Sequence, residues 1–159
     1  MNTRSELSLV DVTLTTVAGA IADNEVISQS IEIPYAVSLK GGHSIIQSIV
    51  LNSDDTETPA MDLVFSQVNT AIASAASELV GASVADLDTA GASVLGHVSL
   101  SNYTDMVDFV TATKTNIGLV VGSAITTKSI FVHAINRSGG NFTPTATDDL
   151  HLRIGFVRS

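Results

Sequence analysis

The stretch ATDDLHLRIGFVRS, residues 146–159, carries the clearest sign of how this chain folds. Apolar side chains occupy every second position, at Leu150, Leu152, Ile154 and Phe156. The positions between them hold His151, Arg153 and Gly155. Successive side chains of a β-strand point to opposite faces of a sheet, so this period of two predicts a strand with one face in the core. In a sandwich or jelly roll such a strand pairs with strands distant in sequence, so deleting the last eight residues is expected to prevent folding.

The same alternation recurs along most of the chain. Runs rich in Val, Ile, Thr and Phe, the residues that strands favour, occupy residues 7–14, 25–39, 41–55, 60–69, 92–103, 106–122 and 128–140. We count eight or nine strands without long amphipathic helices between them, which disfavours parallel βαβ units. The prediction is a single all-β domain over residues 1–159, an antiparallel β-sandwich of jelly-roll-like type. Residues 1–24 are a possible N-terminal arm exchanged between subunits.

Three local patterns refine this prediction. The first run is interpreted as one apolar series with a phase slip at Val10, formed by Leu7, Leu9, Val12 and Leu14. Pro34 cannot donate a hydrogen bond to a sheet, so it indicates a strand end or an edge. The turn residues Asn52 to Asp55 stand between two strand-like runs, which predicts that those runs form a hairpin.

One Ala-rich segment, from Asn69 to Gly91, departs from the alternation. Its apolar residues recur at helical spacing: Ile72, Ala75, Ala76, Leu79 and Val80. We interpret the segment as a short helical or irregular connection over one end of the sandwich. The alternative is a mobile segment that becomes ordered on binding a partner.

Composition narrows the classes of function. The chain has 16 acidic and seven basic residues, a formal net charge of −9 at pH 7, and no cysteine. Nucleic-acid binders need clustered Lys and Arg to displace counterions, so nucleic acid is not expected as a partner. Disulfides and thiolate metal sites are excluded. No run approaches the ~18 apolar residues of a membrane helix, and no secretory signal is visible, so no membrane partner is expected.

Candidate ligands for a metal are scattered. The four histidines each lack a second ligand at the short spacing that zinc sites usually show: His43, His97, His133 and His151. The acidic pairs Asp54–Asp55 and Asp148–Asp149 are interpreted as turn carboxylates. Asp86 and Asp88 alternate in DLDTAG next to a glycine, which leaves calcium binding there open.

Motifs for catalysis are also missing from the sequence. There is no G-x-S-x-G nucleophile elbow and no phosphate-binding G-x-x-x-x-G-K-[ST] loop. The three N-x-[ST] patterns at Asn102, Asn136 and Asn141 are interpreted as chance matches. We therefore predict no catalytic, cofactor-binding or metal-binding residue and do not expect an enzyme.

Several stretches, taken in order, resemble a family of small structural proteins of tailed bacteriophages. The resemblance spans residues 41–68 and 94–157. Its pattern is a Gly-Gly pair before a strand with an acidic turn, an aromatic strand, a GxV strand, and a TPT loop leading to DLxxxxGF. The matching residues are Gly41, Gly42, Asp54, Phe65, Gly96, Val98, Pro144, Thr145, Leu150, Gly155 and Phe156. The stretch FSQVNTAIAS after the aromatic strand departs from the turn usual in that family.

This resemblance implies a virion component, a decoration or cement protein that binds the major capsid protein on the capsid exterior as a homotrimer. Such a protein would be made in the host cytoplasm. The alternative is a carbohydrate- or receptor-binding module of a head fibre or tail. That alternative needs an exposed aromatic side chain beside polar groups, and the only tyrosines are Tyr35 and Tyr103. A small hydrolase has no supporting motif.

Overall fold

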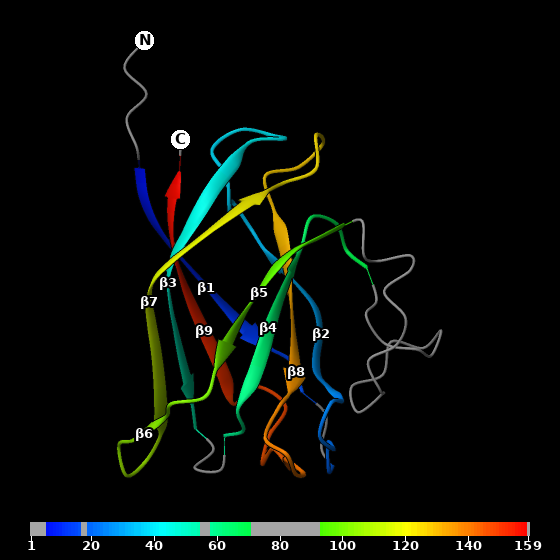
Figure 1. Ribbon diagram of the computed structural model, residues 1–159, viewed down its shortest axis with the longest axis vertical. Coiled ribbons are helices and arrows are strands. Elements are labelled where there is room, and N and C mark those ends of the chain that lie inside the picture. The colour runs from blue at the N-terminus through cyan, green and yellow to red at the C-terminus, as the bar shows by residue number, and fades with distance from the viewer. Residues whose placement is uncertain (1–5, 17–18, 55–57, 71–92, 159) are drawn as a thin grey trace.

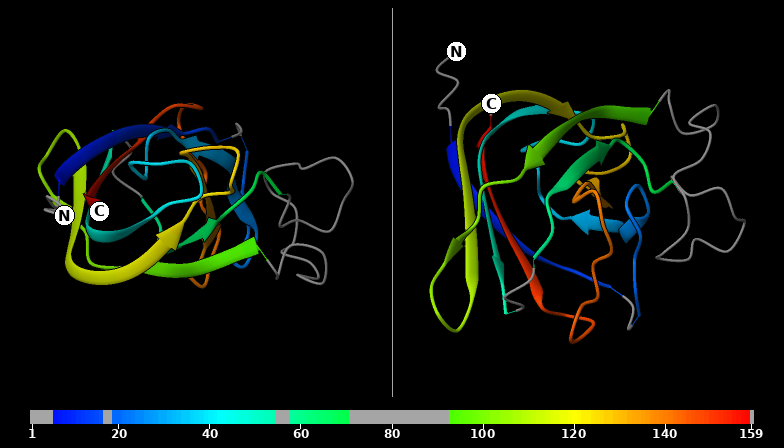
Figure 2. Two further views of the ribbon diagram at one scale, coloured as in Figure 1. Left: turned by 90° about the horizontal axis from the view of Figure 1, so that it is seen from above. Right: turned by 60° about the horizontal axis from the view of Figure 1, so that its bottom comes forward.

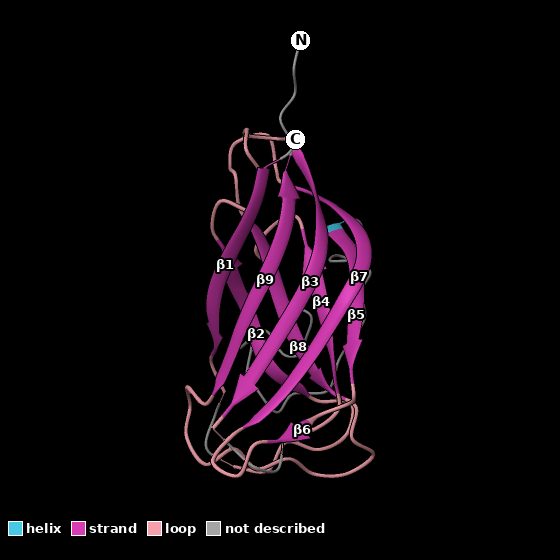
Figure 3. Ribbon diagram, turned by 90° about the vertical axis from the view of Figure 1, so that its left-hand side faces the viewer, coloured by secondary structure: helices cyan, strands magenta, loops and turns pink. Residues whose placement is uncertain are grey.

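The structure is a computed structural model that describes residues 6–16, 19–54, 58–70 and 93–158. Nine strands lie in these residues, with hardly any helix (Figures 1 and 3). Their bounds are β1 Glu6–Leu14, β2 Val26–Ile33, β3 His43–Ser53, β4 Met61–Ser66, β5 Val94–Leu100, β6 Thr104–Asp105, β7 Val110–Gly122, β8 Ile130–Asn136 and β9 Leu150–Arg158. The predicted all-β fold is confirmed.

The strands form two antiparallel sheets that face each other across the core (Figure 2). One sheet has the order β1-β9-β3-β7-β6, and the other has the order β2-β8-β4-β5. Apart from the short β6, the pairs are nested: β1 with β9, β2 with β8, β3 with β7 and β4 with β5. This nesting is the jelly-roll arrangement, in which a long folded ribbon wraps around a single core.

The hairpin predicted around Asn52 to Asp55 is wrong. β3 pairs with β7 and β9, whereas β4 pairs with β5 and β8 in the other sheet. In a jelly roll the chain passes from one sheet to the other between these strands. A turn-rich connection therefore crosses the end of the sandwich here, which local turn chemistry alone does not distinguish from a hairpin.

The core lies between the sheets and follows the alternation of the last strand. Four side chains of β9 are at most 1% exposed: Leu150, Leu152, Ile154 and Phe156. They belong to the same buried cluster as Met61, Leu63 and Phe65 of β4 in the opposite sheet. Burying a side chain of this size contributes about 1.5–3 kcal/mol to stability. The sequence prediction for residues 150–156 is confirmed.

The orientation predicted for β1 is partly wrong. β1 pairs with β9 in an unbroken register, so there is no phase slip at Val10. Val10, Val12 and Leu14 pack on the core, whereas Leu7 and Leu9 are 81% and 68% exposed on the outer face. The sequence misleads because both faces of this edge strand carry leucine, so one apolar series does not fix which face is inside.

Gly96 in β5 sits where the two sheets approach each other. Its φ of +149° lies in a region that side-chain-bearing residues rarely adopt. A Cβ there would also lie 2.7 Å from Cδ1 of Leu119 on β7. Leu119 packs on the core from β7, so the missing side chain lets the open side of the sandwich close. This explains a glycine at the start of the GxV pattern.

Two sequence interpretations concern residues that the structure describes only in part. The Ala-rich segment lies outside the described residues from position 71 onward, and Asp86 and Asp88 lie outside them too. Within the proposed N-terminal arm, residues 6–14 form β1 and pair with β9 of the same chain. Exchange of this strand between subunits stays a prediction.

Candidate functional site

The structure places the four histidines apart. His43 begins β3, His97 lies on β5, His133 on β8 and His151 on β9. No group of three His, Asp or Glu side chains able to hold a metal occurs among the described residues. The described residues likewise contain no helix long and apolar enough to cross a membrane.

Asp149 acts as a turn carboxylate, as its interpretation predicted. Its Oδ2 accepts hydrogen bonds from the Ala146 backbone N–H at 2.7 Å and the Thr145 hydroxyl at 2.8 Å. Its backbone carbonyl also accepts the N–H of Asp54 at 3.2 Å. The carboxylate therefore holds the loop before β9 in place.

His133 is a buried histidine whose hydrogen bonds fix its tautomer. The Ser66 hydroxyl donates its only proton to the Val68 carbonyl at 2.9 Å, and it lies 3.1 Å from Nε2 of His133. Nε2 must therefore carry the proton and donate to Ser66. Nδ1 is a bare acceptor that meets no partner among the residues the structure describes. Burial lowers the pKa of His133 from 6.5 to about 4.

This burial makes stability depend on pH. Between pH 6.5 and 4 the unfolded chain binds a proton at His133 that the folded chain does not, so stability falls as pH drops through this window. The loss is on the order of 3 kcal/mol. Urea unfolding of the wild type at pH 7 and 4 measures it, and His133→Gln should remove this part of the pH dependence. His97→Gln, at an exposed strand position, is the matched control; an unchanged pH dependence in His133→Gln contradicts the prediction.

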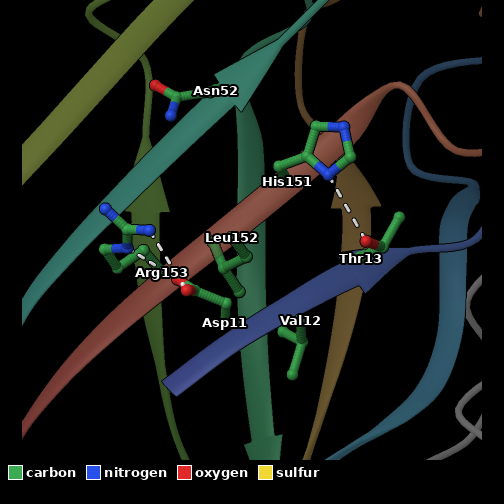
Figure 4. Close-up of a pocket in the computed structure, with 7 residues that line it drawn as sticks. All are labelled: Asp11, Val12, Thr13, Asn52, His151, Leu152 and Arg153. Carbon is green, nitrogen blue, oxygen red and sulfur yellow. Dashed lines mark hydrogen bonds and ion pairs between the residues drawn. The ribbon is translucent and has the colours of Figure 1, made fainter. Parts of the chain in front are cut away.

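A polar groove of about 340 Å³ lies on the outer face of the β1-β9-β3-β7 sheet (Figure 4). Arg153 of β9 donates two hydrogen bonds to the carboxylate of Asp11 on β1, at 2.6 and 3.1 Å. This hydrogen bonding holds the pKa of Asp11 below its ordinary value, although burial opposes the shift. Beside it, Thr13 and Nδ1 of His151 lie 3.3 Å apart. The charges of the groove are thus already paired with each other.

Toward the other end of the same face, apolar side chains form a row across four strands. Leu7 of β1 stands opposite Val157 of β9, Val157 opposite Ile45 of β3, and Ile45 opposite Val120 of β7. We call these four residues the apolar row. Leu7, Ile45 and Val120 are 81%, 37% and 58% exposed. Contiguous exposed apolar side chains on a soluble protein mark interaction surfaces, so this row is the candidate docking site.

Sequence reasoning missed the apolar row. Its members come from four strands separated by up to 150 positions, and each strand contributes one residue at an outward position. Only the register between the strands places them side by side. The one local signal was Leu7 and Leu9, which alternate with the core-facing residues of β1 rather than join them.

Comparisons with known proteins leave the family open. No model of a protein family matches the chain, and no curated protein matches it in sequence. A solved chain described as Desmodium yellow mottle tymovirus is 13% identical, with a TM-score of 0.28. The match covers 98% of this chain and 86% of that chain. A likeness at this TM-score carries no conclusion about function.

Proposed function

We propose that this protein is a structural component of a virus particle, a decoration protein bound to the exterior of a tailed-phage capsid. The main observation behind this proposal is the apolar row, which crosses the outer face of the β1-β9-β3-β7 sheet. The sequence resemblance to small tailed-phage structural proteins supports it. The fold is compatible, since jelly rolls serve in many viral coat and lectin domains.

A flat apolar row suits binding to a repeated protein surface. Each contact releases water from a few apolar side chains, which gives modest affinity per subunit. A capsid presents many identical sites, and a ligand that binds only the assembled shell stabilises that shell by mass action. The formal net charge of −9 keeps an abundant coat protein soluble and does not attract it to packaged DNA. The partner proposed is the major capsid protein.

A homotrimer is the assembly proposed for the bound protein. In a closed trimer, one patch of each subunit contacts a different patch of the next subunit around the three-fold axis. β1 is an edge strand, paired on one side only, and it borders the apolar row. The apolar row and the edge of β1 therefore lie on the same side of the molecule, where a neighbouring subunit can contact both.

The proposal predicts that the apolar row is needed for capsid binding and not for folding. The double variant Ile45→Ser with Val120→Ser should cosediment with shells of the parent phage's major capsid protein at least about tenfold more weakly than wild type. Its thermal unfolding should stay cooperative with a modest fall in Tm, because Val120 is 58% exposed and Ile45 is 37% exposed. Val107→Asn, at an 84% exposed site in the turn between β6 and β7, is the control.

Light scattering after size exclusion measures the oligomeric state at the same time. A mass near three subunits supports the trimer. A single-subunit mass together with no cosedimentation of the wild type overturns the proposal. Equal cosedimentation of the double variant and the wild type overturns the role given to the apolar row.

The alternative function is a carbohydrate- or receptor-binding module, and one observation favours it. Tyr35 is 67% exposed at the end of the sandwich, beside two lysines. Tyr103 does not serve in this way, because its hydroxyl is shielded from solvent. The surroundings of Tyr35 therefore define what such a module would bind.

A further inference from the structure

We propose that the pocket between the β2–β3 and β7–β8 loops binds an acidic saccharide. Its volume is about 380 Å³, and its chemically useful lining residues are Glu32, Tyr35, Lys40, Thr126, Thr127 and Lys128. The two loops lie at the same end of the sandwich (Figure 1). None of these residues belongs to the apolar row, so this site is additional to the proposed docking face.

The two loops are fixed to each other by backbone hydrogen bonds. The Gly41 N–H donates to the carbonyls of Ala124 at 3.1 Å and Thr127 at 3.2 Å, and the Ser123 N–H donates to the Gly42 carbonyl at 3.1 Å. Within the β7–β8 loop, the Ser123 hydroxyl donates to the Thr127 carbonyl at 2.8 Å. Gly41 has φ +70°, and a Cβ added there would lie 3.1 Å from the Cα of Ile125, so glycine permits this close approach. A pocket held in this way loses little conformational entropy on binding.

The pocket gathers positive charge in an otherwise acidic protein. Only three lysines occur in the chain, and Lys40 and Lys128 both line this pocket. Within the described ranges, Arg137 and Arg153 are paired with carboxylates, whereas Lys40 and Lys128 form no ion pair. Glu32, the acidic residue of the lining, accepts a hydrogen bond from the Ser129 hydroxyl at 2.6 Å. Two unpaired ammonium groups are therefore free to bind one carboxylate or phosphate.

Tyr35 supplies the surface that favours a sugar over a simple anion. It is exposed, and its backbone is held in the left-handed region at φ +55° directly after Pro34. A tyrosine ring offers a flat apolar face at low entropic cost, on which the C–H face of a pyranose can pack. The hydroxyls of Thr126 and Thr127 are able to exchange hydrogen bonds with sugar hydroxyls. The ligand that fits is a short saccharide bearing a carboxylate or phosphate.

Titration with three probes tests this proposal on the full chain. The probes are trigalacturonate, its neutral counterpart galactotriose, and inorganic phosphate. Calorimetry gives the affinities, and tyrosine fluorescence reports on Tyr35, because the chain has no Trp and its other tyrosine is shielded. Trigalacturonate is expected to bind at least about tenfold more tightly than either other probe, since charge-assisted bonds and ring stacking act together.

Matched variants separate the pocket from general charge effects. Lys128→Gln and Lys114→Gln change the net charge equally, but Lys114 lies on β7 and donates to the Ser99 carbonyl, outside the pocket. Lys128→Gln should weaken trigalacturonate binding about fivefold or more, and Lys114→Gln by less than about twofold. Tyr35→Asn removes the ring while tolerating the left-handed backbone, and should weaken binding of trigalacturonate but not of phosphate.

The proposal is overturned if trigalacturonate does not bind at millimolar concentration, or if it binds no more tightly than galactotriose or phosphate. Equal weakening of trigalacturonate binding by both lysine variants also overturns it. Capsid binding by the wild type is measured separately, so failure here is distinguishable from failure of the decoration proposal. Loss of capsid binding in Lys128→Gln with no saccharide bound by the wild type would assign the lysines to a protein partner instead.

Discussion

We expect that a chain lacking residues 152–159 does not fold, because of the position of β9 in its sheet. β9 lies inside its sheet, between β1 and β3, and it pairs with both along its whole length. The deletion removes the buried side chains of Leu152, Ile154 and Phe156. It also removes seven of the nine residues of β9 that pair with β1, and it opens the inner edge of β3. At about 1.5–3 kcal/mol for each side chain, together with the backbone pairing lost on both sides of β9, the loss is comparable with the roughly 5–15 kcal/mol by which a domain is stable.

Soluble expression and far-UV circular dichroism measure the outcome. Deleting only residues 158 and 159 is the control, because it removes just the last pair of β9 with β1 and the last pair with β3, and it should leave a cooperative unfolding transition. The single variant Phe156→Ala should fold but lose about 3–5 kcal/mol. A cooperative thermal transition in the chain lacking residues 152–159 would show that β9 is dispensable.

Asn136→Ala is expected to cost about 4 kcal/mol, the second large effect. The Asn136 side chain is fully buried at the end of β8. Its amide nitrogen donates to the carbonyls of Ile21 at 2.9 Å, Ala22 at 3.1 Å and Gly140 at 2.9 Å. Its side-chain oxygen accepts the Ser138 N–H at 3.0 Å. Alanine removes all four bonds, at about 1 kcal/mol each. The three carbonyls keep other donors, but the Ser138 N–H loses its acceptor.

Urea unfolding of Asn136→Ala against the wild type measures this cost. Asn102→Ala is the matched control, because Asn102 is an exposed asparagine in the same kind of N-x-[ST] pattern. Its stability should change by less than about 0.5 kcal/mol. A loss below about 1 kcal/mol in Asn136→Ala would mean that water replaces the amide. The burial of Asn136 also agrees with the interpretation of its N-x-[ST] pattern as a chance match.

The strands were predictable because alternation is a local property of the sequence. Leu150 to Phe156 is the clearest case, since polar residues or glycine separate the apolar ones and all four apolar side chains are buried. Pairing between strands was not predictable, because the β3–β4 connection looks like a hairpin turn yet crosses between sheets. At β1, leucine on both faces concealed which side is buried.

The candidate surfaces were less predictable than the fold. The apolar row needs the register of four strands, and the saccharide pocket joins two loops whose contacts, such as Gly41 with Ser123, span 82 positions. The sequence contains two tyrosines, Tyr35 and Tyr103, that a saccharide-binding surface could use. Which of them is exposed depends on tertiary packing, and no local pattern around either residue indicates it.

The nested pairing of strands also governs when this protein can fold during its synthesis. β1 is made before the other described strands, but β9, its partner strand among the described residues, ends at Arg158. At roughly 5–20 residues per second, the chain between them takes on the order of ten seconds to make. Throughout that time β1 has no partner strand, and the sheet it belongs to lacks an inner member. This sheet therefore cannot be completed until β9 has been made, and until then the growing chain exposes apolar strands that chaperones can shield.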